Sequence, residues 1–149
     1  MPNTTKEQFL RGNKTIAGAY GTLWVDNEKI AEVKSFNAKV IANRSTVQLG
    51  LSEDSKIQSV KGEGTYTVHK VYSRAKKYVE MWNKGKDTRG RITSALKDPD
   101  AVDGKEERVS IDNVWVNEVV IGAWTRGEGV EEETPFGFTP EDVEFEEAI

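Results

Sequence analysis

The chain has 149 residues, of which 31% are charged and 9% aromatic, and its formal net charge is −4. This length fits one domain with a sizeable core, and the aromatic content argues against disorder. The lack of cysteine excludes disulfides and thiolate metal sites, and the single histidine, His69, cannot form a histidine-rich zinc site. No apolar run is long enough for a membrane span and no signal peptide is recognisable, so we expect no membrane insertion.

The N-terminal part of the chain predicts a polar arm followed by an unusually long strand. Residues 1–15 are polar, and we expect a flexible arm there and a single domain over residues 16–149. Residues 20–25 predict a short strand that ends in a turn. Residues 30–49 are rich in strand formers with alternating polarity. They predict a half-buried strand far longer than the usual five or six residues.

A second long strand follows after turn-forming and charged residues. Residues 50–59 predict a loop, and residues 60–72 predict a strand. Gly62 and Gly64 lie on one face of that strand, which suggests a bulge or a close approach of another backbone. If the two long strands form a hairpin, we expect the connecting segment 43–59 at its tip.

One helix is predicted between Ser73, which can cap its N-terminus, and Gly85, which can end it in a left-handed conformation. Its apolar stripe has the spacing of one helical face and is expected to pack on a sheet; it comprises Ala75, Tyr78, Val79 and Trp82.

The C-terminal half predicts further strands over residues 91–97, 108–116 and 128–138, and a continuation of the sheet over residues 119–124. A change of parity near Asp112 suggests a bulge. About seven strands and one helix favour a mainly β protein, an antiparallel β-sandwich or barrel with one flanking α-helix.

Each candidate catalytic or metal-binding motif lacks a residue that its chemistry requires. Asp98, Asp100 and Asp103 resemble a calcium loop, but the third aspartate comes one residue late and the twelfth position is Val109. The glycine-rich residues 61–65 lack the Lys-Ser/Thr ending of a phosphate loop. We therefore predict that the protein is not an enzyme and has no cofactor and no metal site.

Charge is unevenly distributed. Residues 127–149 hold nine acidic and no basic residues, whereas residues 74–91 hold seven basic residues. An acidic segment of this kind is either solvated or docks on a basic surface. We hypothesise that residues 128–147 meet basic residues of a neighbouring subunit. The acidic candidates are Glu131, Glu132 and Glu133, and the basic ones are Lys76, Lys77, Lys84, Lys86, Arg89 and Arg91.

Several stretches carry a family resemblance by their order and spacing. They are residues 18–26 with 28–33, 62–65 leading to 69–71, 96–100, 107–109 with 113–114, and 135–139. In these stretches the chain resembles the tail tube (tail core) proteins of contractile-tailed phages and PBSX-type defective prophages, from about Asn13 to the C-terminus.

The resemblance implies a structural virion protein whose hexameric rings stack into the inner tail tube inside a contractile sheath. It implies as partners further copies of the chain, the tail sheath protein, and tail initiator, baseplate and tape-measure proteins. DNA would pass through the lumen without sequence-specific binding, and the protein would occur in the virion tail and, during assembly, in the host cytoplasm. Two alternatives stay open: the tube of a phage-tail-like bacteriocin or injection device, and a small β-barrel ligand-binding protein.

The resemblance also places a long loop at the hairpin tip, reaching an adjacent subunit or the next ring. Four of its side chains are too apolar for a solvated tip, and three charged ones could form a rim. The apolar candidates for inter-subunit contact are Val47, Leu49, Leu51 and Ile57, and the charged ones are Glu53, Asp54 and Lys56. The alternative is that the apolar side chains pack back on their own subunit.

Overall fold

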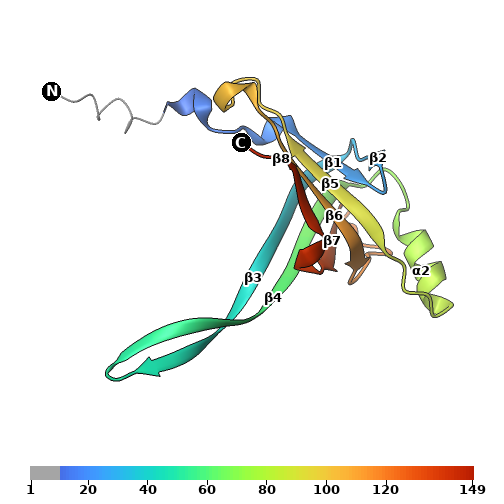
Figure 1. Ribbon diagram of the computed structural model, residues 1–149. Coiled ribbons are helices and arrows are strands. Elements are labelled where there is room, and N and C mark those ends of the chain that lie inside the picture. The colour runs from blue at the N-terminus through green and yellow to red at the C-terminus, as the bar shows by residue number, and fades with distance from the viewer. Residues whose placement is uncertain (1–10) are drawn as a thin grey trace.

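The computed structural model of the protein describes residues 11–149, and most of this part is antiparallel β structure (Figure 1). Its eight strands are β1 (Gly21–Val25), β2 (Glu28–Lys29), β3 (Val33–Leu49), β4 (Ser52–His69), β5 (Gly90–Leu96), β6 (Glu107–Val116), β7 (Glu131–Phe138) and β8 (Val143–Glu147). The α-helix of the described part is α2 (Ala75–Asn83), and short 3₁₀ turns are η1 (Gly12–Lys14), η2 (Gly18–Tyr20), η3 (Val102–Gly104) and η4 (Pro140–Asp142).

The strands form two sheets that share β6. The first contains β2, β1, β5, β6 and β8, and the second contains β6, β7, β4 and β3. Strand β6 passes from one sheet to the other at Asn113, where one extra residue shifts its register with β5 and the backbone has a φ of +52°. The bulge predicted near Asp112 is therefore confirmed. This arrangement also confirms the predicted mainly β, antiparallel fold with one flanking helix.

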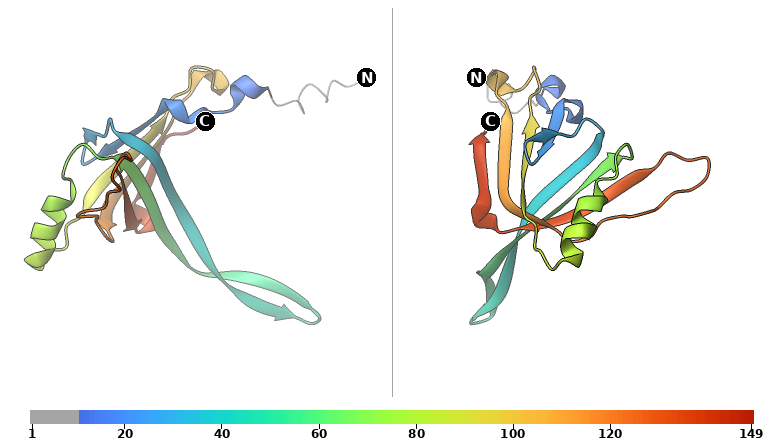
Figure 2. Two further views of the ribbon diagram at one scale, coloured as in Figure 1. Left: turned by 180° about the vertical axis from the view of Figure 1, so that it is seen from behind. Right: turned by 90° about the vertical axis from the view of Figure 1, so that its right-hand side faces the viewer.

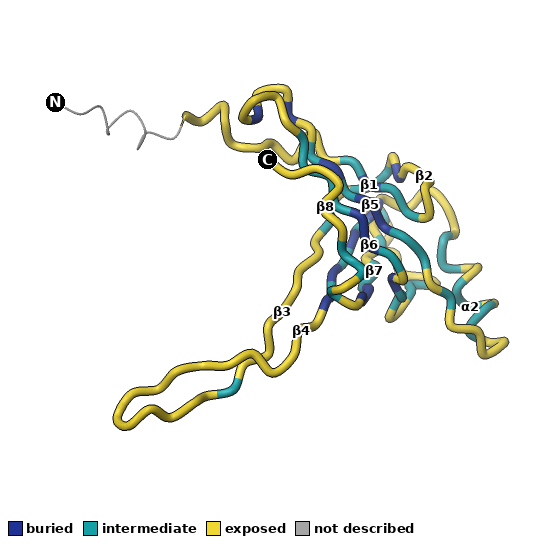
Figure 3. Tube along the Cα trace, viewed as in Figure 1, coloured by how far each residue is buried: buried dark blue, intermediate teal, exposed yellow. Residues whose placement is uncertain are grey.

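The core lies where the two sheets face each other (Figure 3), and consists of Leu23, Ile30, Tyr66, Val68, Ile92, Ile111, Val114, Phe136 and Phe138. The ring of Phe136 is at its centre, with centroids 6.0 Å from Phe36 and 6.2 Å from Tyr66. Aromatic packing of this kind joins β3, β4 and β7, and it holds the root of the long hairpin in a fixed direction.

The predicted role of the two glycines in β4 is confirmed. A Cβ atom at Gly64 would lie 2.6 Å from Cζ of Phe136, and one at Gly62 would lie 2.7 Å from the carbonyl oxygen of Phe138. Only glycine allows β7 and its phenylalanines to approach β4 this closely.

Several predicted boundaries are wrong. Residues 50–59 are not a loop, because Ser52 begins β4 and its polar residues pair with β3. Residues 119–124 lie in the connection between β6 and β7 and form no strand. The chain continues beyond β7 into β8, which pairs with β6. Both long strands are also shorter at the core than predicted. β3 begins at Val33 rather than at residue 30, and β4 ends at His69 rather than at residue 72.

The helix forms as predicted but begins and packs differently. Its N-cap is Arg74, without a side-chain capping bond, so Ser73 does not cap it. Gly85 ends it with a φ of +73°, as predicted. The apolar stripe is only half-buried, because α2 lies beside the sheets rather than flat on one of them (Figure 1).

Two polar contacts tie the flanking segments to the sheets. Arg74 donates hydrogen bonds to Glu32, ahead of β3; burial alone would raise the pKa of Glu32, but these bonds outweigh it and lower the pKa. The backbone N–H of Ala17 donates to Asp98 at 3.0 Å, and this bond lowers the pKa of Asp98.

Residues 1–10 of the predicted arm lie outside the described residues, so its boundary at residue 15 stays a prediction.

Candidate assembly surface

The most prominent feature of the subunit is the hairpin of β3 and β4, which projects far beyond the sheets (Figures 1 and 2). The two strands are paired from Val33 and Val68 at the root to Leu49 and Ser52 at the tip. Gly50, with a φ of +63°, makes the turn there. The predicted hairpin is confirmed, but its end is a tight turn rather than a long loop.

An extra residue, Gln58, divides the hairpin into two parts. Asn43 pairs with Ser59 but Arg44 pairs with Ile57, so β4 bulges between them. A bulge bends a ribbon and increases its twist, which fits the bend of the hairpin in Figure 1. We call residues 43–59, from this bulge to the tip, the distal arm.

The distal arm has no core of its own. Its residues are exposed on both faces, apart from the half-buried Ser45 (Figure 3). Side-chain bonds within it are few and polar: Arg44 donates to Ser55 at 3.2 Å and Gln58 to Ser45 at 2.7 Å. An isolated two-stranded ribbon is marginally stable in water.

Both sides of the arm end in open strand edges. β3 is the last strand of its sheet, so its outer edge meets no strand among residues 11–149. On the other side, β7 covers β4 only from Gly62 to His69, which leaves the edge from Ser52 to Lys61 open. Open edges of this length recruit other chains, and soluble monomers normally avoid them.

The two faces of the hairpin between its root and the bulge, residues 33–42 and 60–69, differ in character. Ala38, Val40, Gly62 and Gly64 lie on the face that continues the core, whereas Lys39 and its neighbours lie on the opposite, polar face. On the polar face, Glu63 carries ion pairs with Lys39 at 3.7 Å and Lys61 at 3.6 Å.

The seven contact candidates predicted for the hairpin tip all lie on the distal arm. Each is exposed: Val47, Leu49, Leu51, Glu53, Asp54, Lys56 and Ile57. Leu51 is fully exposed in the turn, and Leu49 and Ile57 are 57% and 49% exposed. The alternative that these apolar side chains pack back on their own subunit is therefore wrong; their contact with another subunit stays a prediction.

The three acidic candidates lie elsewhere, at the start of β7. Glu131, Glu132 and Glu133 pair there with residues His69 to Thr67 of β4. Ile57 and Thr67 are ten residues apart along β4, or roughly 33 Å, so one subunit does not bring the acidic and apolar groups together. They would contact different parts of a neighbour.

Two of these carboxylates have partners within the subunit. Glu131 accepts a hydrogen bond from Lys34 at 2.9 Å, which lowers its pKa, and Glu132 forms an ion pair with Lys70 at 2.6 Å. Glu133 is exposed and has no ion pair among the described residues.

Most of the basic candidates also have local partners. Lys77 lies 3.8 Å from Asp26, Arg89 lies 3.0 Å from Asp87, and Arg91 contacts both Asp112 and Glu146. Lys76 lies 4.0 Å from Glu80 in the same helix. Lys84 and Lys86, which follow α2, have no ion pair within residues 11–149.

Sequence reasoning missed two further features of the surface. The first is the connection between β6 and β7, residues 117–130, which extends away from the sheets (Figure 2, right). We call it the β6–β7 loop. Its Ile121 and Trp124 are 84% and 72% exposed. The apolar run over residues 119–124 is the sequence signal for this surface, although its composition favours a strand.

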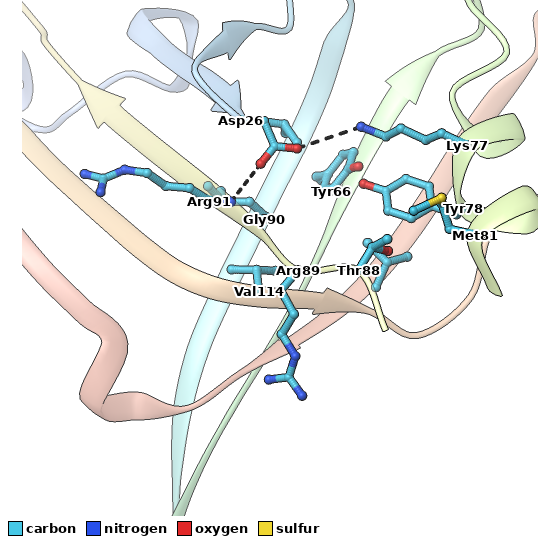
Figure 4. Close-up of a pocket in the computed structure, with 13 residues that line it drawn as sticks. Asp26, Tyr66, Lys77, Tyr78, Met81, Thr88, Arg89, Gly90, Arg91 and Val114 are labelled. Carbon is cyan, nitrogen blue, oxygen red and sulfur yellow. Dashed lines mark hydrogen bonds and ion pairs between the residues drawn. The ribbon is translucent and has the colours of Figure 1, made fainter. Parts of the chain in front are cut away.

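The second is an apolar cleft of about 270 Å³ between α2 and the sheets (Figure 4). Tyr78 and Met81 contribute from the helix, and Val114 and Tyr66 from the strands. Burial in this region raises the pKa of both tyrosine hydroxyls.

Other classes of site find no support in the described residues. No group of three or more acidic or histidine side chains within residues 11–149 is placed to hold a metal ion. None of the helices described there has the length and apolar character needed to cross a bilayer.

Comparison with known families gives a match along most of the chain. A family model described as phage tail tube protein matches residues 8–147. Two relatives come from Bacillus subtilis (strain 168). The phage-like element PBSX protein XkdM is 32% identical over 138 residues, 90% of this chain and 93% of XkdM. The uncharacterized protein YqbM is 31% identical over 137 residues, with coverage of 90% and 93%.

Solved structures with the same fold come from contractile injection systems. A chain of the extended PVC sheath–tube complex, from an extracellular contractile injection system, is similar with a TM-score of 0.67 and 10% identity, covering 90% of this chain and 93% of that one. A chain of the anti-feeding prophage cap, which terminates its tube, has a TM-score of 0.65 and 11% identity, with coverage of 94% and 96%. At these identities the similarity shows the fold alone.

Proposed function

The chain belongs to the phage tail tube family, and on this premise we propose that it is the structural subunit of a tail tube, with copies that form hexameric rings stacked inside a contractile sheath. The observation that carries the proposal is the projecting β3–β4 hairpin, whose two edges are open over most of their length. The role is structural rather than enzymatic.

The two open edges of the hairpin support ring formation. We infer that the outer edge of β3 in one subunit pairs with the open edge of β4, from Ser52 to Lys61, in the next. Such a contact joins two different surfaces, so it is head-to-tail and either closes into a ring or continues as a filament. Its main-chain hydrogen bonds would extend over roughly 33 Å of strand.

The polarity of the hairpin supports an assignment of its faces. The apolar side, with Ala38 and Val40, faces the body of its own subunit, where Phe138 and Phe145 also line a groove with it. The side with Lys39, Lys61 and Glu63 would then face the lumen. A polar wall of mixed charge suits a conduit through which DNA slides without sequence-specific contacts.

The partners proposed for the tube are the sheath protein outside it and the initiator or baseplate and tape-measure proteins at its ends. The fold shared with sheath–tube, cap and baseplate structures supports this group of partners. We place the protein in the phage tail, and in the host cytoplasm while the tail assembles. A bacteriocin-like particle or an injection device would use the same subunit in the same way, and the presence of capsid genes beside the tube gene would separate these cases.

Negative-stain electron microscopy tests the proposal directly. Concentrated protein, with and without the tail initiator proteins of its own particle, should form rings or hollow tubes of constant diameter. A dilute monomer would be uninformative, since tubes of this kind start from an initiator. Protein that stays monomeric at high concentration with initiator present, and that binds a small ligand in the cleft beside α2, would favour the ligand-binding alternative instead.

The acidic residues at the start of β7 give a salt-dependent prediction. We expect the Glu131, Glu132 and Glu133 to Lys triple variant to assemble more slowly than the wild type, and the deficit to be larger at low salt. Exposed pairs contribute about 0–1 kcal/mol each and are screened, so only a network repeated around a ring has a visible effect. Light scattering at two salt concentrations measures it.

The internal ion pairs of Glu131 and Glu132 require a matched control. Glu133→Lys alone changes an exposed carboxylate that has no ion pair among the described residues, so it should keep the monomer intact and still slow assembly. Equal assembly rates for both variants and the wild type at both salt concentrations would contradict the contact.

A further inference from the structure

The β6–β7 loop carries a large apolar surface that its own subunit does not cover. Ile121 and Trp124 are 84% and 72% exposed, although they follow the strand-forming residues Val119 and Val120. Connections of this length without secondary structure are uncommon in compact domains and are usually functional. The loop therefore presents an anchor for a partner.

Both ends of the loop are fixed to the sheets, which keeps the anchor outside. The N–H of Asn117 donates to the carbonyl of Pro135 at 3.0 Å, and the N–H of Lys70 donates to the carbonyl of Val130 at 2.8 Å. Between these points the loop extends away from the body of the subunit (Figure 2, right).

The cleft beside α2 is apolar, like the exposed side chains of the β6–β7 loop, and it forms a recess where the loop presents a projection. Its walls are mainly apolar, and its volume of about 270 Å³ suits a large side chain. The Oγ1 atom of Thr88 is buried there and has no hydrogen-bond partner among the described residues. Figure 4 shows Thr88 beside Met81 and Tyr78. A buried hydroxyl without a partner is costly, so a shift of the cleft wall that brings this atom to a donor would be favoured.

Tryptophan matches this cleft better than other apolar side chains do. Its indole N–H is a donor only, and it normally finds an acceptor when the ring is buried. Thr88 Oγ1 would accept that hydrogen bond only after the cleft wall shifts to expose it, and Met81 and Val114 also line the cleft. Tryptophan is also a residue type that dominates the binding energy of interfaces.

Charges around the two surfaces are complementary as well. The loop holds Glu118 and Glu128 against one basic residue, Arg126. The residues that line the cleft include three basic residues, Lys77, Arg89 and Arg91, against one acidic residue, Asp26. Opposite charges at the rim of an apolar contact favour the correct orientation of the partner.

We propose that Trp124, with Ile121, inserts into the cleft between α2 and the sheets of a second copy of this chain. This contact is separate from the pairing of hairpins. It gives a role to the β6–β7 loop and to the cleft beside α2, which take no part in that pairing. The inference rests on the proposed function, since it requires copies of the chain to assemble.

Cross-linking in the cysteine-free chain tests the placement. Thr125→Cys keeps Trp124 in place, and Lys77→Cys marks the rim of the cleft. The two variants are assembled together and treated with a short bismaleimide. We expect a covalent dimer between unlike chains, and none when Lys77→Cys is replaced by Val102→Cys, an exposed position on η3.

A pair of substitutions tests the energetics of the same contact. Trp124→Ala should raise the protein concentration needed for assembly at least tenfold, without a change in the thermal midpoint of the monomer, because the side chain is exposed there. Val102→Ala, which also removes exposed apolar surface, should change neither quantity.

The outcomes separate this inference from the proposed function. Normal tubes without the cross-link to Lys77→Cys, or normal assembly of Trp124→Ala, would overturn the inference and leave the tube intact. Absence of any assembly by the wild type with its initiator would overturn the proposed function and the inference together.

Discussion

Removal of the distal arm should give a folded subunit that no longer assembles. The variant lacks residues 43–59 and joins Ala42 to Val60, which already pair with each other, through an Asn-Gly turn. Asn-Gly suits a two-residue hairpin turn. Because the distal arm contributes no residue to the core, the free energy of unfolding should change by less than about 1 kcal/mol, or roughly 2–4 °C in thermal midpoint.

The expected effect on assembly is complete loss of rings and tubes, because the variant lacks most of the open edge of β4. Thermal melts followed by circular dichroism measure the first effect, and sedimentation with negative-stain microscopy measures the second. Thr46→Ala is a suitable control, since it changes one exposed side chain of the arm that is not a contact candidate and leaves both edges intact. Tubes of normal length from the truncated variant would show that the arm is not the ring-forming element.

The second large effect is expected in the core. Phe136→Ala should lower the free energy of unfolding by about 3–5 kcal/mol, the usual cost of removing a large buried aromatic side chain. Phe136 is fully buried and contacts the rings of Phe36, Tyr66 and Phe138. A loss of this size is a large fraction of the 5–15 kcal/mol typical of a domain.

Urea unfolding measures this difference, and Phe145→Ala is the matched control. Phe145 is 64% exposed, so its removal should change the free energy of unfolding by no more than about 0.5 kcal/mol. A loss below 1 kcal/mol for Phe136→Ala would mean that the core does not hold the root of the hairpin as described.

Alternating patterns in the sequence were sufficient to predict most of β3 and the root half of β4, and they made a hairpin of the two a natural possibility. The glycines of β4 were also informative, because a missing side chain within a strand has few explanations. Polarity patterns gave wrong predictions where a strand is fully exposed to solvent or a loop carries apolar residues. Residues 52–59 look like a loop since they are polar, yet a projecting ribbon is solvated on both faces and needs no apolar residues.

The opposite error occurred in the β6–β7 loop. Residues 119–124 have the composition of a buried strand but meet no partner strand among the described residues. Strand β8 was missed for a related reason: its acidic residues suggested a solvated tail, whereas Glu146 forms ion pairs with Arg91 and Arg108 beside β6. Assembly contacts are outside the reach of local patterns, because they depend on surfaces from distant parts of the chain.

The open main-chain edges of the distal arm limit how specifically such a tube can select its own subunits. Hydrogen bonds between backbones are the same for every sequence, so an arm held by them alone would accept a foreign subunit with an arm of equal length. Substitutions on its solvated faces could accumulate freely over evolutionary time without loss of pairing. Discrimination between self and non-self would then lie in the side chains at the subunit body, where charge and shape differ from one tube to another.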